Sequence, residues 1–232
     1  MTTLVLVRHG QASFGAHNYD VLSQVGERQG TLLGDHWREL KPDFDAAYCG
    51  AMVRQRHTGE QVLHALGRRE VPIHERAAFN EYDADKVVRA YLPLVAKEHP
   101  DFSMDKRQLF ADRKHFQRFF EKVIACWTAN RPHSVPGLES WTEFCERCVQ
   151  GLREVATPES KRVVVFTSGG VITAALRQAL KLDDETSFRM NWRIYNASVH
   201  HFHVGRSGLS LMGFNDIAHL ELAREPTLLT FR

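Results

Sequence analysis

The run Leu4-Val5-Leu6-Val7-Arg8-His9-Gly10 constrains the fold most, because an apolar segment stops abruptly at residues suited to chemistry. Four consecutive apolar residues predict a short strand buried on both faces, which is typical of a parallel sheet covered by helices. In open sheets of this kind, ligands bind beyond the carboxyl ends of the strands, where Arg8 and His9 lie. Gly10 lets the backbone turn sharply at this point. The alternative is a surface loop whose arginine and histidine have no chemical role.

The chain has 232 residues, which is enough for one large domain or for a domain with a sizeable insertion. Its 43% hydrophobic and 25% charged residues are typical of a globular protein, and its net charge of +2 gives no support to a bulk nucleic-acid-binding surface. No apolar run approaches the ~20 residues of a membrane span. The apolar start is too short for a signal peptide and leads into Arg8. We therefore predict a cytoplasmic protein with no nucleic-acid and no membrane partner.

Strands and helices alternate on both sides of a long helical stretch, which is typical of an α/β fold. Before that stretch we predict strands over 4–7, 45–49 and 71–74 and helices over 25–40 and 52–66. After it we predict a strand over 162–166, a helix over 171–180 and a hairpin of two strands over 197–203 and 209–214. The stretch from about 83 to 156 is broken at Pro93, Pro100, Pro132 and Pro136, and we interpret it as an insertion over the sheet. We therefore predict one domain, 1–232, whose helical lobe can wall a substrate cavity.

Residues suited to phosphate chemistry follow the other predicted strands as well. Arg54 lies in the first turn of a predicted helix, Glu81 follows the third strand, and Ser168 precedes the turn Gly169-Gly170. Two arginines can grip a phosphoryl group, a neutral imidazole can attack phosphorus, and a carboxylic acid can protonate the leaving alkoxide. Backbone N–H groups at a glycine-rich turn can bind an anion, although a plain tight turn is the alternative. The set favours phosphoryl transfer.

Five segments in the right order resemble those of the histidine phosphatases, the superfamily that contains the cofactor-dependent phosphoglycerate mutases and many acid-type phosphatases. Residues 6–11 match the R-H-G signature, and residues 19–29 match L-[ST]-x-x-G-x-x-Q. Residues 52–58 match R-x-x-x-T, which carries the second arginine, and residues 79–81 match L-N-E, which carries the acid. Residues 137–140 resemble G-E-S with one extra residue. R-H-G alone is not specific, whereas the ordered set covers most of the chain.

The resemblance implies a phosphoglycerate mutase-like fold, a three-layer α/β/α sandwich with a mostly parallel central sheet. It implies a phosphomonoester hydrolase, in which a small phosphorylated substrate gives a phosphohistidine on His9. It calls for no metal and no organic cofactor. Glu81 would donate the proton, and the two arginines would act in catalysis and hold the phosphate. The implied catalytic residues are His9, Glu81, Arg8 and Arg54, and the implied phosphate-binding residues are Arg8, Arg54, Ser168, Gly169 and Gln11.

The last strand end departs from the family pattern. The family usually has V-x-H-G-G there, and residues 166–170 read Phe-Thr-Ser-Gly-Gly, so Ser168 stands where a second histidine is expected. Serine can donate one hydrogen bond but carries no positive charge, and losing a charge-assisted contact costs about 1.5–3 kcal/mol of phosphate stabilisation. Two alternatives to the hydrolase follow. One is a phosphoglycerate mutase-type phosphotransferase, and the other is a weakly active or inactive relative that binds a phosphorylated ligand.

The remaining candidates have plainer interpretations. Cys145 and Cys148 form a C-x-x-C pair inside a helical pattern, and we interpret them as core thiols rather than a redox or metal site. His201 and His203 share one face of a predicted strand, but no third metal ligand is identified. His57 follows Arg54 by three residues and either lines the pocket or lies partly exposed. The sequence leaves the substrate and the oligomeric state open, with a homodimer as one candidate.

Overall fold

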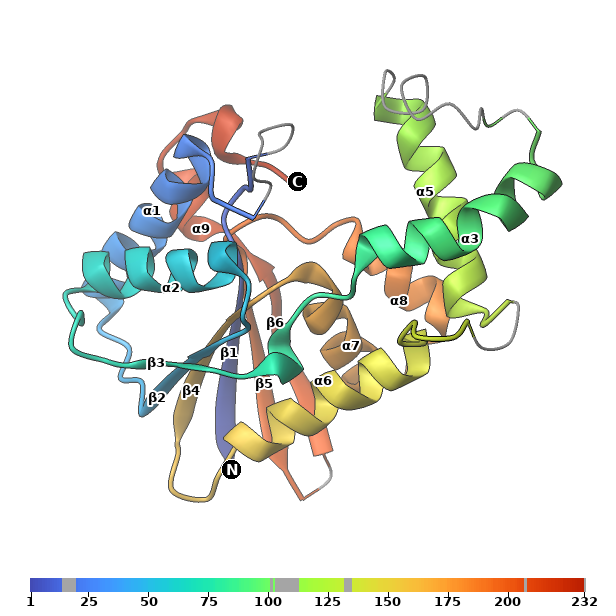
Figure 1. Cartoon of the computed structure of the whole chain (residues 1–232). Coiled ribbons are helices and arrows are strands. Elements are labelled where there is room, and N and C mark those ends of the chain that lie inside the picture. Colours follow the sequence, from blue (N-terminus) through green and yellow to red (C-terminus); the bar gives the residue numbers. More distant parts are fainter. Residues whose placement is uncertain (14–19, 101, 103–112, 132–134, 207, 232) are drawn as a thin grey trace. The chain divides into compact units, whose positions relative to one another are not determined.

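The apolar run at the N-terminus forms β1 (Thr2–Arg8), the strand that lies between β4 (Arg162–Thr167) and β5 (Val199–Gly205). The remaining strands of the six-stranded sheet are β2 (Ala46–Cys49), β3 (Ile73–Glu75) and β6 (Gly208–Asp216), in the order β3-β2-β4-β1-β5-β6. Four neighbouring strands are parallel, and β5 and β6 are antiparallel at one edge (Figure 1). The prediction of a mostly parallel sheet is therefore confirmed.

This computed structural model describes the chain apart from residues 14–19, 101, 103–112, 132–134, 207 and 232. The described residues form two compact units. Unit 1 contains Met1–Glu81 and Arg147–Arg232, and unit 2 contains Tyr82–Glu146. The sheet belongs to unit 1. The predicted break at Pro132 and the first residue of the L-[ST]-x-x-G-x-x-Q segment lie outside the described residues.

Helices cover both faces of the sheet in unit 1, which confirms the three-layer sandwich (Figure 1). On one face lie α1 (Gln24–Leu40), α2 (Val53–Leu66) and the short α9 (Ala218–Leu222). On the other face lie α7 (Gly169–Leu180) and the part of α6 (Trp141–Val155) that begins at Arg147. The core between the first layer and the sheet contains Val5, Val7, Leu33, Trp37, Val62, Val164 and Phe166. Because successive strand residues point to opposite faces, the residues of the run Leu4–Val7 are buried alternately on the two helix-covered faces of the sheet.

Local signals in the sequence set the helix ends. The Ser23 side chain caps α1 by accepting from the Gly26 N–H, and Gly67 ends α2 with φ of 83°, a conformation that suits glycine. The predicted helix and strand ends lie within two residues of those observed. The α8 helix (Asp184–Asn191) was not predicted, since it buries only Ser187 and Phe188 and gives little apolar periodicity. Short 3-10 helices occur at Ala77–Phe79 and Pro226–Leu228.

The predicted break at Pro93 is wrong, because this proline lies inside α3 (Ala84–Glu98). Proline removes the hydrogen bond to the carbonyl group four residues earlier, which belongs to Arg89. Both residues are exposed, so water can take the place of the missing donor. Pro100 follows the end of α3, and Pro136 lies in a turn before α6, as predicted.

Unit 2 contains a cluster of aromatic side chains from the segment just before α3, from α5 (Arg113–Thr128) and from the start of α6. Tyr82 packs on Trp127 with ring centroids 4.7 Å apart, and Trp141 stacks on Phe144 at 5.6 Å. The predicted lobe ran to about residue 156, whereas residues 147–156 lie in unit 1. That this lobe covers the sheet stays a prediction.

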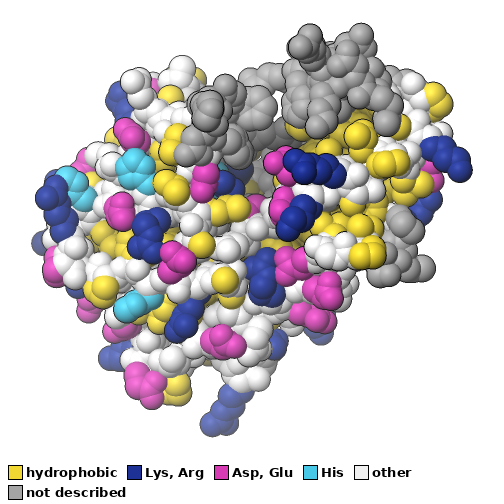
Figure 2. Space-filling view, in the orientation of Figure 1, with side chains coloured by type: hydrophobic (Ala, Val, Ile, Leu, Met, Phe, Trp, Pro, Cys, Tyr) yellow, Lys and Arg dark blue, Asp and Glu magenta, His cyan; other side chains and the backbone are white. Residues whose placement is uncertain are grey.

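The surface of unit 1 mixes charges of both signs. Figure 2 shows Lys and Arg interspersed with Asp and Glu over the face of this unit that it displays. Among the described residues, each helix is too short or too polar to cross a membrane.

Candidate active site

His9 continues β1 beyond its last residue and lies almost fully buried, with 5% of its surface exposed. Its backbone N–H donates to the Thr167 carbonyl at 2.8 Å, and its carbonyl accepts from the Asn196 side chain at 3.1 Å. These bonds lock the backbone on both sides of the residue. The imidazole is therefore presented from a rigid strand end between β4 and the segment that precedes β5.

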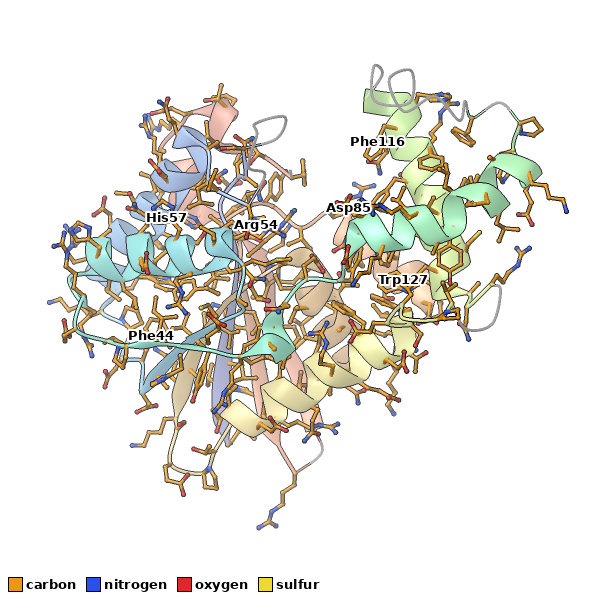
Figure 3. All side chains as sticks on the ribbon, in the orientation of Figure 1. Phe44, Arg54, His57, Asp85, Phe116 and Trp127 are labelled. Atoms are coloured by element: carbon orange, nitrogen blue, oxygen red, sulfur yellow. The ribbon has the colours of Figure 1, made fainter. Side chains whose placement is uncertain are left out.

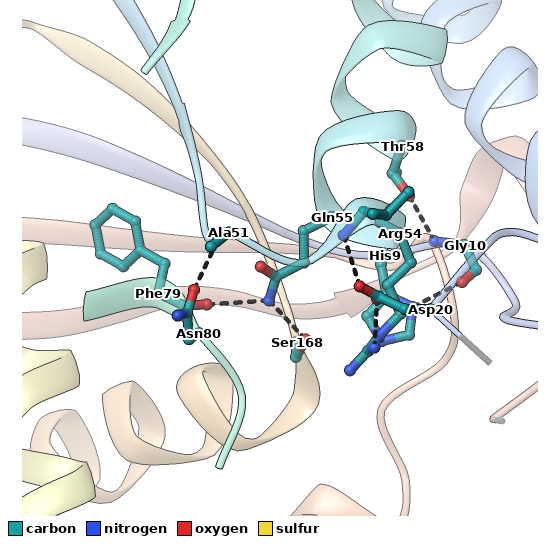
Figure 4. Close-up of polar contacts among 11 residues, drawn as sticks. His9, Gly10, Asp20, Ala51, Arg54, Gln55, Thr58, Phe79, Asn80 and Ser168 are labelled. Carbon is teal, nitrogen blue, oxygen red and sulfur yellow. Dashed lines mark hydrogen bonds and ion pairs between the residues drawn. The ribbon is translucent and has the colours of Figure 1, made fainter. Parts of the chain in front are cut away.

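The contacts of the His9 ring define its protonation. Nδ1 lies 2.7 Å from the Gly10 carbonyl oxygen, which can only accept, so Nδ1 carries the hydrogen and Nε2 has a free lone pair. Arg54 Nε donates to this Nε2 at 3.2 Å (Figure 4). Burial, followed by the charges of Arg54 and Arg8, holds the pKa of His9 well below its usual value of 6.5. His9 is thus a neutral imidazole whose Nε2 lone pair faces a guanidinium group.

Arg54 is buried in the first turn of α2 and is held by Asp20. The Asp20 carboxylate accepts from Arg54 Nη1 at 2.7 Å and from the Val53 backbone N–H at 2.9 Å. It therefore both fixes the arginine and caps a helix that has no cap of its own. Asp20 lies inside a segment that matches the family pattern, but the sequence analysis gave it no role.

Thr58 connects the second arginine segment to the R-H-G turn. Its hydroxyl donates to the Arg54 carbonyl at 2.7 Å and accepts from the Gly10 N–H at 3.0 Å. The turn also touches the start of α1, since a Cβ atom added to Gly10 would lie 2.4 Å from the Gly26 carbonyl oxygen. Both glycines are needed for this close approach.

Arg8 and Gln11 lie on either side of this turn. Arg8 Nη1 donates to the Ile194 carbonyl, and the charge of Arg8 lowers the pKa of both His9 and His200. The Gln11 side chain lies beside the N-terminal end of α1, where its oxygen accepts from the Ser23 hydroxyl at 2.8 Å. The structure thus places Arg8 beside His9, and the phosphate-binding role of Gln11 stays a prediction.

Ser168 lies at the end of β4, fully buried, and contacts a residue that the sequence analysis missed. Gln55, also fully buried, donates from Nε2 to the Ser168 hydroxyl oxygen at 2.7 Å and to the Phe79 carbonyl at 3.0 Å. In the sequence, the one signal for a role of Gln55 is its position next to Arg54. A glutamine in the first turn of a helix is otherwise most often a surface residue.

The Glu81 side chain contacts the turn that follows Ser168. Its carboxylate accepts from the Gly170 backbone N–H at 3.0 Å. The Gly169-Gly170 amides were predicted to bind phosphate, and the structure shows the Gly170 N–H bound to this carboxylate. Glu81 is thereby brought to the same strand end as Ser168, at the N-terminus of α7.

The remaining candidates lie elsewhere. His57 shares α2 with Arg54 (Figure 3), but it contacts Gln61 and lines a surface hollow of about 470 Å³ with Glu60 and His64. Cys145 and Cys148 are buried thiols in α6, as predicted. Within the described part of the chain, no group of three or more His, Cys, Asp or Glu residues could hold a metal ion.

The histidines of β5 differ in burial, since His201 and His203 are partly exposed and His200 belongs to the interior of unit 1. His200 is fully buried, accepts from the Asn215 N–H at Nδ1 and lies 3.0 Å from the Ser198 hydroxyl at Nε2. Burial, then the charges of Arg8 and His201, lower its pKa to about 3. It is therefore a neutral structural histidine behind Arg8.

Comparison with protein families identifies the superfamily of this chain. The sequence model of the histidine phosphatase superfamily (branch 1) matches residues 4–115 and 101–217. A 2,3-bisphosphoglycerate-dependent phosphoglycerate mutase of Parvibaculum lavamentivorans is 25% identical over 197 residues, 81% of this chain and 84% of that protein. Another such mutase, of Bartonella quintana, is 30% identical over 87 residues, 35% of this chain and 42% of that protein.

Solved structures share the fold at low sequence identity. A phosphoglycerate mutase of Bacillus anthracis superposes with a TM-score of 0.66 at 17% identity, over 97% of both chains. A phosphoserine phosphatase mutant of Entamoeba histolytica in complex with phosphoserine gives 0.63 at 16% identity, over 95% of this chain and 100% of that one. The chain belongs to the histidine phosphatase superfamily.

Proposed function

We propose that the protein hydrolyses phosphomonoesters through a phosphohistidine on His9. The observation that carries this proposal is the neutral, buried imidazole whose Nε2 lone pair faces Arg54 at 3.2 Å. A nucleophilic imidazole must be unprotonated, and its target must be held by cations that balance the charge on the phosphoryl oxygens. His9 and its two arginine neighbours meet both requirements.

The reaction has two steps. Nε2 attacks phosphorus and forms an N–P bond while the P–O bond to the leaving group breaks, and protonated Glu81 gives its proton to the departing alkoxide. Water then attacks the phosphohistidine, loses a proton to the Glu81 carboxylate and releases inorganic phosphate. Arg8 and Arg54 hold the phosphoryl oxygens in both steps, and Asp20 keeps Arg54 in place. The Ser168 hydroxyl adds a neutral donor.

A mutase is the second candidate, because sequence relatives of this chain are phosphoglycerate mutases. The family name and the phosphoserine phosphatase with the same fold support the hydrolase. A screen of phosphomonoesters distinguishes them. A hydrolase releases phosphate without a priming bisphosphate. A mutase interconverts phosphoglycerates only after priming, and a binding protein does neither.

The first prediction is that His9→Ala abolishes turnover, because the proposed phosphoenzyme forms on this imidazole. Brief reaction with a radiolabelled phosphomonoester, followed by alkaline quenching, should label the wild-type chain on His9 and leave His9→Ala unlabelled. His57→Ala is the matched control, since His57 lies on the surface of α2, and it should be labelled like the wild type. Label that survives in His9→Ala would overturn the assignment.

A further inference from the structure

Gln55 and Ser168 form a buried polar pair beside His9. Both are fully buried, and the carboxamide nitrogen lies 2.7 Å from the serine oxygen (Figure 4). Ser168 follows Thr167, whose carbonyl accepts from the His9 backbone N–H, so the pair lies at the strand end next to the nucleophile. Gln55 also follows Arg54 directly in α2. The pair therefore joins the two segments that flank the proposed phosphate site.

The direction of each hydrogen bond in the pair can be assigned. The Phe79 carbonyl can only accept, and it receives Gln55 Nε2 at 3.0 Å and the Thr167 hydroxyl at 2.9 Å. The carboxamide nitrogen must therefore point toward Phe79 and Ser168, and Ser168 accepts from it. No residue in the described part of the chain accepts the Ser168 hydroxyl hydrogen. That hydrogen is left for a ligand.

The Gln55 side chain is also confined in space. Its Oε1 lies so close to Gly50 that a Cβ atom added there would be 2.1 Å away. Oε1 therefore packs against the Gly50 backbone while Nε2 is bound to the Phe79 carbonyl, and these contacts hold the carboxamide beside Ser168. The serine oxygen therefore accepts from Nε2, and its hydrogen points away from Gln55.

We propose that Gln55 is a positioning residue that holds Ser168 so that its hydroxyl donates to the bound phosphoryl group, and that the pair fills the space of an imidazole. This proposal rests on the proposed function for the identity of the ligand. If the pair fills this space, a larger side chain at position 168 should not fit beside Gln55. A histidine placed at position 168 would collide with the carboxamide, which lies at hydrogen-bond distance from the much smaller serine oxygen.

The first experiment compares inorganic phosphate binding by calorimetry in the wild type, Gln55→Met, Ser168→Ala and the double variant. Methionine keeps the volume of glutamine and removes the donor. Each single variant should bind phosphate about three- to tenfold more weakly, the share of one neutral hydrogen bond. The double variant should be no weaker than Ser168→Ala alone, because Gln55 acts only through the serine. Independent, multiplying losses would overturn the proposal.

The second experiment introduces Ser168→His with Gln55, Gln55→Met or Gln55→Ala. Only the Gln55→Ala background leaves room for the ring, so only there should phosphate bind more tightly and show a new dependence on pH near the histidine pKa. A new pH dependence with Gln55 intact would show that the pair does not fill this space. No gain in any background would place residue 168 outside the phosphate site. Thermal unfolding identifies variants that fail to fold. If Gln55→Met fails to fold, Gln55→Ala replaces it in the binding experiment.

The two proposals fail in different ways. Turnover of phosphomonoesters by the wild type tests the hydrolase, whereas the phosphate-binding cycle tests Gln55. Gln61→Met is the matched control, because Gln61 lies on α2 but contacts His57 at the surface. It should bind phosphate like the wild type. A similar loss in Gln61→Met would show a general effect on α2 and refute a specific role of Gln55.

Discussion

At the scale of single residues, a substitution of Glu81 tests whether the site contains a general acid. Glu81→Gln keeps an oxygen that can accept from the Gly170 N–H, so the local structure should survive. Without a proton donor, hydrolysis of alkyl phosphates should slow by about 10²- to 10⁴-fold, whereas an activated aryl phosphate, whose leaving group departs unaided, should slow far less. The measurement is kcat/KM on both substrates.

Glu75→Gln is the control for this prediction, because Glu75 is an exposed carboxylate that pairs with Arg56 at 2.9 Å. It should leave both rates unchanged. Equal losses on alkyl and aryl phosphates in Glu81→Gln would show that the carboxylate only supports the turn at the start of α7.

The residues proposed for catalysis could be predicted from the sequence, whereas the residues that hold them in place could not. Arg8, His9 and Arg54 stand out because strand ends and a family pattern place them together. Asp20 and Gln55 were not predicted as site residues, because their roles depend on contacts with residues that are distant in the chain. Asp20 reaches Arg54 across 34 positions, and Gln55 reaches Ser168 across 113. Local periodicity carries no information about such pairs.

At the scale of elements, the contact between the R-H-G turn and α1 should be sensitive to a single methyl group. A Cβ atom added to Gly26 would lie 2.2 Å from the Gln11 carbonyl oxygen, which belongs to the backbone. Gly26→Ala should therefore lower the free energy of unfolding by about 1–3 kcal/mol, measured by urea denaturation. In an unhindered helix the same change would stabilise the protein by about 0.5–1 kcal/mol.

Gly205→Ala provides the comparison, since an added Cβ atom there would meet only Met1 at 3.5 Å, an ordinary contact. It should change stability little. If Gly26→Ala were as stable as the wild type, the start of α1 would have to be free to move away from the turn.

Element types were predictable wherever a segment buries a clear apolar pattern. The strand β1 and the helix α1 are examples, and the cap at Ser23 fixed the start of the helix. The α8 helix was missed although Asp183 caps it by accepting from the Thr186 N–H, because capping alone is a weak signal without apolar periodicity. The Pro93 break was wrong because α3 continues through this proline, at an exposed position where water can reach the Arg89 carbonyl group.

At the scale of the whole molecule, the strand order could not be derived from local patterns. Each strand was visible as an apolar run, but the pairing of β1 with β4 joins residues about 160 positions apart. The family resemblance supplied the sandwich, and the hairpin of β5 and β6 was the one pairing that short-range turn signals gave. The same interior buries several histidines, which has a consequence for stability.

The last prediction concerns the pH dependence of folding. Burial lowers the pKa of His200 to about 3 and that of His219, which also faces His36, to about 4, and it lowers the pKa of His9. Unfolded histidines titrate near 6.5, so below that pH the unfolded chain binds more protons than the folded one. The contribution of these groups to stability is therefore complete above about pH 7 and is lost as the pH falls from about 6.5 toward 4. Each group adds up to about 1.4 kcal/mol per pH unit to the slope.

Removing one of these histidines should flatten the curve. His219→Gln should lower the slope of the free energy of unfolding against pH by nearly one proton between pH 6 and pH 4.5, measured by urea denaturation at several pH values. His219 suits this test because its Nε2 has no hydrogen-bond partner among the described residues, and its bond to the Ala197 backbone is one that a glutamine amide can also make. His64→Gln, at an exposed position, is the comparison for the loss of an imidazole. An unchanged slope in His219→Gln would mean that this imidazole is already protonated in the folded protein, despite its 3% exposure.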